Sequence, residues 1–365
     1  MLFRSDPGVG IYIDGIYFPR SVGSVMDLVD VGRMEVLRGP QGTLFGKNTI
    51  GGAINIVSAP PSGQDAGSAQ VTLGSFGRAD FSGKADFVVV PDVLDARIAV
   101  ISKNQDGYAR LRDVDMATGR PGAVIDDRGN QSKLGARVAF GWRPSDGLRL
   151  TLAGDYSRSR EEPAPINLLA YTGGPKPAPA LGDLWNGLVG IPAGTPMSDR
   201  FISGDPDTTY GTANPVNDLD LWGLGLTVSK DLGAAELVSI TGLRGFDALF
   251  GRDGDGTPID WNQSLNDQKQ RQFSQELRLD GSSFGDRFKW TGGLFYFHEK
   301  NIDRNEVQVV PGLWAALESL PVQLTGAPCV APFLAPGCAG NPLNANLDLR
   351  ISAYNRVVGD SYAAF

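Results

Sequence analysis

A few stretches of this 365-residue chain hold residue types that could carry out chemistry. His298 is the single histidine, so a Ser-His-Asp hydrolase or an Asp-His protease would have to use it. His298 lies in an alternating segment in phase with Tyr296, so we expect it on a surface of the fold and not in a pocket. We therefore predict no catalytic residue in this chain.

Two other short stretches resemble ligand-binding loops. Residues 42–48 (Gly-Thr-Leu-Phe-Gly-Lys-Asn) hold three residues between their glycines and Asn after the lysine, whereas a phosphate-binding loop has four and then Ser or Thr. Residues 253–256 (Asp-Gly-Asp-Gly) could offer oxygen atoms to Ca²⁺, but the further ligands of a calcium loop do not follow. The sequence thus predicts no cofactor and no metal site.

Composition narrows the class of protein further. The chain has 33 basic and 41 acidic residues without blocks of either sign, which argues against a nucleic-acid partner. The longest apolar run, Phe87 to Val90, ends at Pro91 and is far shorter than the ~20 residues of a membrane-spanning helix. The two cysteines, Cys329 and Cys338, lie in a Pro/Gly-rich stretch; they are a candidate disulfide, with two separate thiols as the alternative.

From about residue 69 the chain repeats segments in which apolar and polar residues alternate. Leu148, Leu150, Leu152 and Tyr156 share one parity, whereas the side chains between them are mostly polar. A period of two predicts strands with opposite faces. The same pattern recurs in the segments 94–101, 135–142, 222–228, 273–279 and 288–296. The segment 234–248 alternates too weakly to be oriented.

The connections between these segments alternate in length. Short turns near 89–93, 144–147, 231–233 and 281–286 separate long polar links near 107–130, 159–217, 249–266 and 301–358. Outer-membrane barrels combine short turns at one end with long loops at the other, whereas soluble domains seldom keep such long links. We therefore predict an antiparallel transmembrane β-barrel arrangement, with nine strands in residues 69–300 and a tenth starting near 359. A soluble sandwich would not explain the alternation of loop lengths.

Residues 1–62 follow a different pattern. Tyr12 to Tyr17 predicts a hairpin that turns at Asp14-Gly15, a pair that tolerates positive φ. The segment 27–37 should end in a strand, and 53–57 should form another. Residues 60–63 (Pro-Pro-Ser-Gly) read as a linker. These residues should therefore form a separate unit.

Residues 36–46 and 51–56 strongly resemble the plug signature of TonB-dependent receptors. The segments 12–15, 273–279 and 290–296 are similar to that family's plug hairpin and barrel strands. The signature positions are Glu35, Arg38, Gly39, Pro40, Gln41, Gly42, Gly46, Gly51, Gly52 and Asn55.

The resemblance implies a mainly β fold in which a small α/β plug fills a 22-stranded barrel. Residues 1–62 would be the C-terminal half of the plug, and residues 63–365 would be the first part of the barrel, with about ten strands. We expect the signal peptide, the TonB-contacting segment, the front of the plug and the last strands to lie outside this chain.

The resemblance also implies a function. It predicts a ligand-gated transporter in the outer membrane of a Gram-negative bacterium, surrounded by lipid and energised by the inner-membrane TonB complex. Its cargo would be a ferric siderophore or a similar scarce nutrient. The alternative is an outer-membrane hydrolase or protease on a ten-stranded barrel, against which the plug signature argues because a small barrel has no room for a plug.

Several charged residues fall on the polar faces of the predicted strands. They are candidate partners of the plug, with simple solvation in the lumen as the alternative; they are Arg97, Arg137, Arg149, Glu276 and Arg278. Arg38 in the signature should also meet a carboxylate, with Glu35 nearest in sequence and Glu276 as a candidate on the wall.

Overall fold

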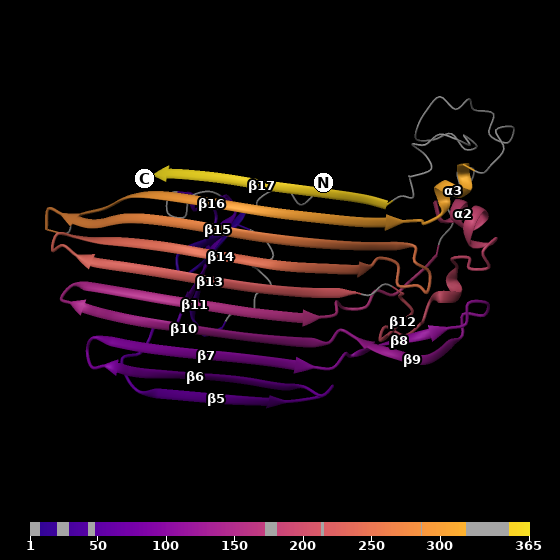
Figure 1. The fold of residues 1–365 in the computed structure, drawn as a ribbon, viewed down its shortest axis with the longest axis horizontal. Coiled ribbons are helices and arrows are strands. Elements are labelled where there is room, and N and C mark those ends of the chain that lie inside the picture. The colour runs from indigo at the N-terminus through magenta and orange to yellow at the C-terminus, as the bar shows by residue number, and fades with distance from the viewer. Residues whose placement is uncertain are drawn as a thin grey trace, which may run out of the picture.

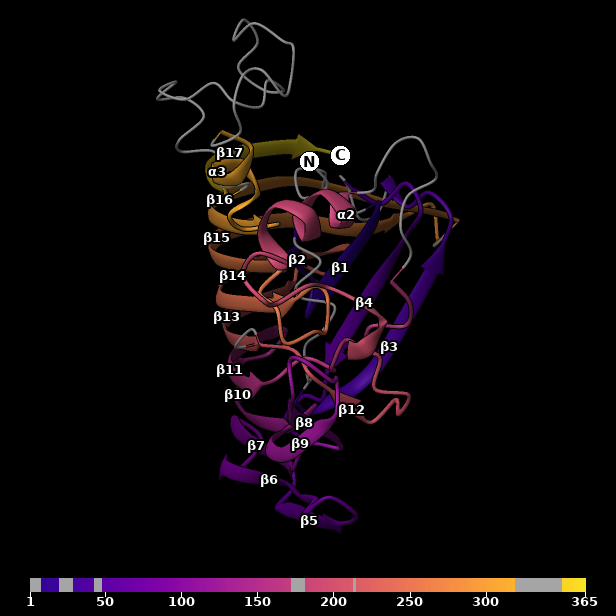
Figure 2. The same ribbon diagram turned by 90° about the vertical axis from the view of Figure 1, so that its right-hand side faces the viewer.

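The structure of the protein is a computed structural model that describes residues 8–19, 29–42, 48–171, 181–212, 215–285, 287–318 and 350–365. It consists mainly of two β-sheets. A small sheet near the N-terminus lies against one face of a tall, curved sheet (Figures 1 and 2). We call them the inner sheet and the wall.

The inner sheet has four strands in the order β2-β1-β4-β3. β1 (Val9–Ile13) and β2 (Ile16–Phe18) form the predicted hairpin, whose turn residues Asp14 and Gly15 have φ values of 52° and 79°. Positive φ at both central positions matches the twist of a tight hairpin. β4 (Gly52–Ser58) runs parallel to β1 and antiparallel to β3 (Val31–Arg38).

The wall is a ten-stranded sheet in which every neighbouring pair is antiparallel. Its strands follow one another in chain order: β5 (Ala66–Leu73), β6 (Ala79–Val90), β7 (Leu94–Gln105), β10 (Gln131–Ser145), β11 (Leu148–Glu161), β13 (Val216–Asp231), β14 (Ala235–Asp253), β15 (Asn262–Ser283), β16 (Phe288–Val309) and β17 (Arg350–Ala364). A meander with this order agrees with the predicted barrel strands and not with a sandwich.

The two ends of the wall differ as the loop lengths predicted. The short turns gather at one end, and the long links gather at the other (Figure 1). The links have structure of their own: β8 (Ala109–Val114), β9 (Pro121–Arg128) and β12 (Thr208–Thr209) form a small sheet, and α2 (Leu181–Trp185) and α3 (Leu313–Glu318) lie nearby. Side chains from four links share one apolar cluster that includes Val114, Trp185, Ile259 and Leu313.

Among the described residues, none of the helices is both long and apolar enough to cross a membrane.

Several strands are longer than predicted at the link end. β14 runs to Asp253 and β15 starts at Asn262, so the link between them covers 254–261 and not 249–266. Likewise β16 runs to Val309, and the tenth strand starts at Arg350 and not near 359. At this end both faces of the strands are largely polar, so alternation disappears from the sequence while backbone pairing continues.

The register places the predicted apolar faces together on the outside of the wall. Phe140 on β10 pairs with Leu152 on β11, which pairs with Leu226 on β13. Phe140 and Leu152 are 40% and 42% exposed, whereas Ala139 and Ala153 on the opposite face are almost fully buried. Paired residues share a face of a sheet. The apolar face of the wall therefore points away from the inner sheet.

β14 is the strand that the sequence did not orient, and packing explains why. Its Phe246 and Ala248 face the inner sheet in a buried cluster, whereas Leu243 is exposed on the outside. The rest of that cluster comes from the inner sheet and from β13: Ile11, Ile13, Phe18, Ile56, Leu219 and Leu221. Because apolar side chains occur on both faces of β14, they do not alternate cleanly with polar ones.

Candidate functional site

The contact between the hairpin tip and the wall contains a buried ion pair. Arg137 on β10 donates a hydrogen bond from Nη2 to Oδ2 of Asp14 in the hairpin turn, at 2.7 Å. The same carboxylate accepts hydrogen bonds from the backbone N–H and the hydroxyl of Ser58, at 2.8 and 3.0 Å. Asp14 thus links the turn, β4 and the wall.

The ion pair continues along the inner face of the wall. Arg137 lies 3.5 Å from the carboxylate of Asp155 on β11, which also pairs with Arg244 on β14 at 2.8 Å. The side chains of Arg137 and Arg244 are only 7% and 3% exposed. Removing one partner from a buried pair leaves an uncompensated charge, which typically costs about 3–5 kcal/mol. The tip is therefore fixed by a chain of alternating charges.

A second ion pair ties the start of β3 to the wall. Arg97 on β7 donates from Nε and Nη2 to the two carboxylate oxygens of Asp30, at 2.5 and 2.7 Å. It also donates from Nη1 to Asp86 on β6, at 2.5 Å, and Asp86 accepts the backbone N–H of Ser62. Arg97 and Asp86 thus connect strands β7 and β6 of the wall to Asp30, which precedes β3, and to Ser62, which follows β4.

Shape complementarity accompanies these charges. Gly225 on β13 pairs with Gly242 on β14, and Ile16 of the hairpin lies over both. A Cβ atom at Gly225 would approach Ile16 to 3.0 Å, and one at Gly242 would approach it to 2.7 Å. Because real Cβ atoms seldom come this close to a neighbour, the two glycines form a shallow seat for Ile16, which we call the glycine seat.

Aromatic side chains pack beside the glycine seat. Tyr17 contacts Tyr12 within the hairpin and Phe297 on β16, with ring centroids 5.4 and 5.7 Å apart. Gln272 on β15 donates from its side-chain amide to the backbone carbonyl of Tyr17 at 2.6 Å. The hairpin therefore contacts the wall through ion pairs, apolar packing and a backbone hydrogen bond.

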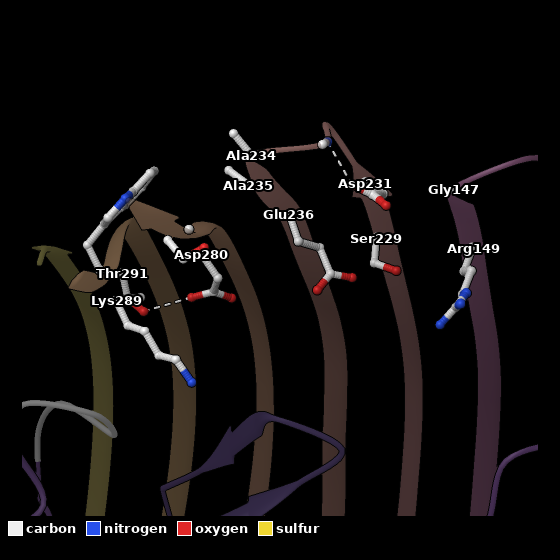
Figure 3. A pocket seen from close by; sticks show the side chains of 14 residues that line it. Gly147, Arg149, Ser229, Asp231, Ala234, Ala235, Glu236, Asp280, Lys289 and Thr291 are labelled. Atoms are coloured by element: carbon white, nitrogen blue, oxygen red, sulfur yellow. Dashed lines mark hydrogen bonds between the residues drawn. The ribbon is translucent and has the colours of Figure 1, made fainter. Parts of the chain in front are cut away.

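Two cavities open along the inner face. One has a volume of about 900 Å³ between the hairpin and the wall and is lined by Asp14, Arg137, Glu276 and Arg278 among others. The other, of about 750 Å³, lies near the short turns, where Arg149, Glu236, Asp280 and Lys289 come from neighbouring strands (Figure 3). Both cavities are lined by charges of both signs.

The structure separates the five predicted inward charges into three groups. Arg97 and Arg137 pair with carboxylates of the inner segment, as described. Glu276 and Arg278 line the larger cavity and pair with each other at 3.0 Å, and Arg278 also pairs with Asp280. Arg149 lies at the smaller cavity near the turns.

The signature residues build the connection between β3 and β4. Gly39 adopts a φ of 82° and donates its N–H to the carbonyl of Gly51, and Gln41 donates its N–H to the carbonyl of Thr49. Gly52 has a φ of 147°, and a Cβ there would come within 2.4 Å of the carbonyl oxygen of Leu37. Gly42 and Pro40 are exposed. Backbone geometry therefore requires glycine at positions 39 and 52.

The other sequence predictions meet different outcomes. Asn55 donates to Glu35 at 2.8 Å, and Glu35 also pairs with Arg33. Within the described parts of the chain, no ion pair joins Arg38 to Glu35 or to Glu276, so the expected pairing is not seen. Gly46, Cys329 and Cys338 lie outside the described residues.

Sequence reasoning missed Asp14, Asp30 and Ile16 as contact residues. The local sequence predicts Asp14 only as a turn residue, although the tip of a hairpin is also the part of a small sheet that can reach a neighbouring element. No local signal marks Gly225 and Gly242 as partners of Ile16, because that contact joins segments far apart in the sequence.

Comparison with known proteins agrees with this architecture. Residues 3–53 match the family model of the TonB-dependent receptor plug domain. The pesticin receptor of Yersinia pestis is 49% identical over 57 residues, which cover 15% of this chain and 8% of that protein. The chain therefore matches less than a tenth of that relative's length.

Solved structures share the fold. The siderophore receptor PiuA from Acinetobacter baumannii superposes with a TM-score of 0.57 at 15% identity, over 81% of this chain and 38% of that one. The ferripyoverdine receptor of the outer membrane of Pseudomonas aeruginosa gives a TM-score of 0.53 at 14% identity, over 82% and 36%.

These findings fix the class of the protein. The inner sheet is plug structure and the wall is part of a receptor barrel, located in the outer membrane of a Gram-negative bacterium. The relatives are receptors and not enzymes, which argues against the barrel-hydrolase alternative. The chain therefore carries part of a TonB-dependent receptor plug domain, followed by a sheet with the fold of a receptor barrel.

Proposed function

We propose that this chain is part of a ligand-gated transporter that is energised by the inner-membrane TonB complex and carries a ferric siderophore. Residues 1–62 contribute to the plug and residues 63–365 to the barrel. Surrounding lipid is its second partner. The names of two structural neighbours, a siderophore receptor and a ferripyoverdine receptor, support this class of cargo.

The contact between the hairpin tip and the wall carries the gating part of the proposal. Two ion pairs join the inner sheet to the wall: Asp14 with Arg137 at the hairpin tip, and Asp30 with Arg97 at the start of β3. A gate of this kind is stable at rest because breaking a buried ion pair is costly. It can still be released by force, because within the described residues these ion pairs hold the inner sheet at two places only, the hairpin tip and the start of β3.

The larger cavity supports the same proposal. It lies directly beside the hairpin and is bounded by Asp14 and Ile16 on one side and by Thr151, Thr227 and Glu276 on the other. Displacing the hairpin would widen this space into a path along a polar wall. A hydrated chelate could follow such a path without entering the apolar outside of the sheet.

Uptake by the full-length receptor tests the proposal. Cells that carry it should accumulate radioactive iron from a panel of ferric siderophores, and they should stop when the TonB system is deleted or the inner membrane is de-energised. Vitamin B12 is tested in the same cells as a cargo that is not a ferric siderophore. Accumulation that persists unchanged without the TonB system would show a passive pore and contradict the proposal.

A further inference from the structure

A single row of residues crosses the inner face of the wall at the height of the hairpin tip. Cross-strand pairing aligns four residues in this row: Arg137 on β10, Asp155 on β11, Gly223 on β13 and Arg244 on β14. Paired residues on neighbouring strands share a face of the sheet, so their side chains adjoin one another. The row therefore places one carboxylate between two guanidinium groups.

The glycine in this row gives Arg244 room to reach Asp155. A Cβ atom at position 223 would lie 2.7 Å from Cζ of Arg244 and 2.8 Å from a carboxylate oxygen of Asp155. Because that atom is absent, Arg244 crosses β13 and donates from Nη1 and Nη2 to the two oxygens of Asp155, at 3.2 and 2.8 Å. Arg137 approaches the same carboxylate from the other side, at 3.5 Å.

Both guanidinium groups keep a donor without an acceptor. The side chains of Arg137 and Arg244 are more than nine-tenths buried, and within the part of the chain that the structure describes the Nε atom of each has no hydrogen-bond partner. A buried donor without an acceptor costs free energy. Both side chains line the larger cavity between the hairpin and the wall. An oxygen acceptor in that cavity would satisfy these donors.

The hairpin supplies the second carboxylate of this site at rest. Asp14 accepts a hydrogen bond from Arg137, so two arginines face two carboxylates. Asp14 also accepts hydrogen bonds from the backbone N–H and the hydroxyl of Ser58, which belongs to the inner sheet. When the hairpin leaves, Asp14 keeps these two bonds, whereas the wall keeps two guanidinium groups and only Asp155. The wall then has one positive charge in excess at this place.

The cavity beside this charge is large enough for a chelate. Its volume of about 900 Å³ lies within the range of small-molecule sites, which is roughly 300–1,000 Å³. The cavity extends from the hairpin toward the short turns, where it is lined by Glu276 and Arg278. Glu276 does not replace Asp14, because it pairs with Arg278 at 3.0 Å. For a cargo that enters from the link end, the site therefore lies behind the hairpin.

We propose that Arg137 and Arg244 form an anion site that Asp14 closes at rest and that takes an oxyanion of the cargo when the hairpin leaves. Guanidinium groups bind such oxygens through charge-assisted hydrogen bonds. A ligand that binds the released state better than the resting state shifts the equilibrium toward release. Anionic chelates therefore stabilise the released hairpin, whereas neutral chelates do not. This inference rests on the proposed function and adds the charge of the cargo that the wall selects.

Chemical labelling of the hairpin in the purified full-length receptor tests the proposal. Ile16 is almost fully buried at rest, so Ile16→Cys, in a protein that also carries Cys329→Ser and Cys338→Ser, reports departure from the glycine seat by its reaction with a maleimide. The probes are two hexadentate ferric chelates, a tris-catecholate, which is a trianion, and a tris-hydroxamate, which is neutral. The readout is the rate of modification at constant ionic strength.

We expect the tris-catecholate to raise this rate by about tenfold at about ten times its Kd for the released state, because a ligand of one state multiplies the population of that state by 1 + [L]/Kd. The tris-hydroxamate should leave the rate unchanged. Equal acceleration by both chelates, or acceleration by neither, would overturn the proposal. The same acceleration by millimolar inorganic phosphate would also overturn it, because the site would then not select the cargo.

Charge variants separate the site from indirect effects. Because Arg137→Gln also loosens the hairpin without any chelate, the compared quantity is the ratio of the rates with and without tris-catecholate. We expect the acceleration to disappear in Arg137→Gln and to return at least in part in Arg137→Lys, which keeps the charge. The matched control Arg304→Gln removes the same charge from an exposed ion pair with Asp267 and should behave as the parent does.

An acceleration in Arg137→Gln that equals that of the parent would contradict the assignment of the site. None of these measurements depends on an energised inner membrane. A failure of the anion site is therefore distinguishable from a failure of TonB-dependent uptake.

Discussion

The guanidinium of Arg137 lies 2.7 Å from the carboxylate of Asp14, although 123 residues separate them in the sequence. This ion pair joins the tip of a hairpin in the plug to the inner face of the barrel wall. It is buried on the wall side and extends through Asp155 to Arg244. The hairpin tip is thus one of the places at which the plug is coupled to the barrel, together with the Asp30–Arg97 ion pair.

Breaking this pair should loosen the plug. Arg137→Ala leaves Asp14 without its cation, whereas Asp155 keeps Arg244, so we expect the plug to lose about 1–3 kcal/mol of stability. Hydrogen exchange of the Ile13 and Ile56 amides measures the effect. Arg33→Ala is the control, because the Arg33–Glu35 pair is exposed and should contribute about 0–1 kcal/mol. Equal protection in both variants would contradict this assignment.

The glycine seat should not tolerate a side chain. Gly242→Ala places a Cβ against Ile16 and should destabilise the plug by about 1–3 kcal/mol. Ile16→Ala in the same protein should restore part of the loss, because the shorter side chain vacates the clashing volume. Gly154→Ala is the matched control on the outer face of the wall, where an added Cβ meets only ordinary contacts. If the double variant is no more stable than Gly242→Ala, the packing argument is wrong.

The link between β14 and β15 should become less stable as the pH rises. Burial is the largest cause that raises the pKa of Asp255 to about 6, assisted by Asp253, while hydrogen bonds from Thr257 and Asn262 act in the opposite direction. The folded link therefore binds a proton more tightly than the unfolded chain, whose Asp pKa is near 3.8. Stability contributed by this group falls as the pH rises between these two values.

Limited proteolysis of the link at pH 5 and pH 7.5 checks this prediction. Cleavage within residues 254–261 should be slower at pH 5, after correction for the pH dependence of the protease on an unfolded substrate. Asp255→Asn should remove most of the difference. A pH dependence that survives this substitution would point to another group.

The strands in which apolar and polar side chains alternate could be predicted from the sequence. Apolar alternation placed the strands and their outward face, and Asp14-Gly15 predicted the hairpin turn. The prediction failed for β14, which could not be oriented. This strand has apolar residues on both faces, because Phe246 packs against the plug. The prediction also ended β16 too early, since the outward residues beyond His298 are mostly polar.

The candidate site was predictable only in part. The phase of Arg97 and Arg137 on their strands indicated that both point inward, where they meet the plug. Phase alone does not give height along the barrel, and Arg149 on the same face lies near the turns instead. The partners Asp14 and Asp30 depend on how two sheets dock, which no local pattern encodes.

The central claim is that the hairpin must leave the wall for cargo to pass. A disulfide between Ile16→Cys and Gly242→Cys would tether it, because a Cβ atom at position 242 would lie directly against the side chain of residue 16. In energised cells with an intact TonB system, we predict that the oxidised double variant binds ferric siderophore but does not import it. Reduction should restore import, and the single variant Ile16→Cys should import under both conditions. If the fully oxidised protein imports cargo as fast as the reduced protein does, this result would contradict the account.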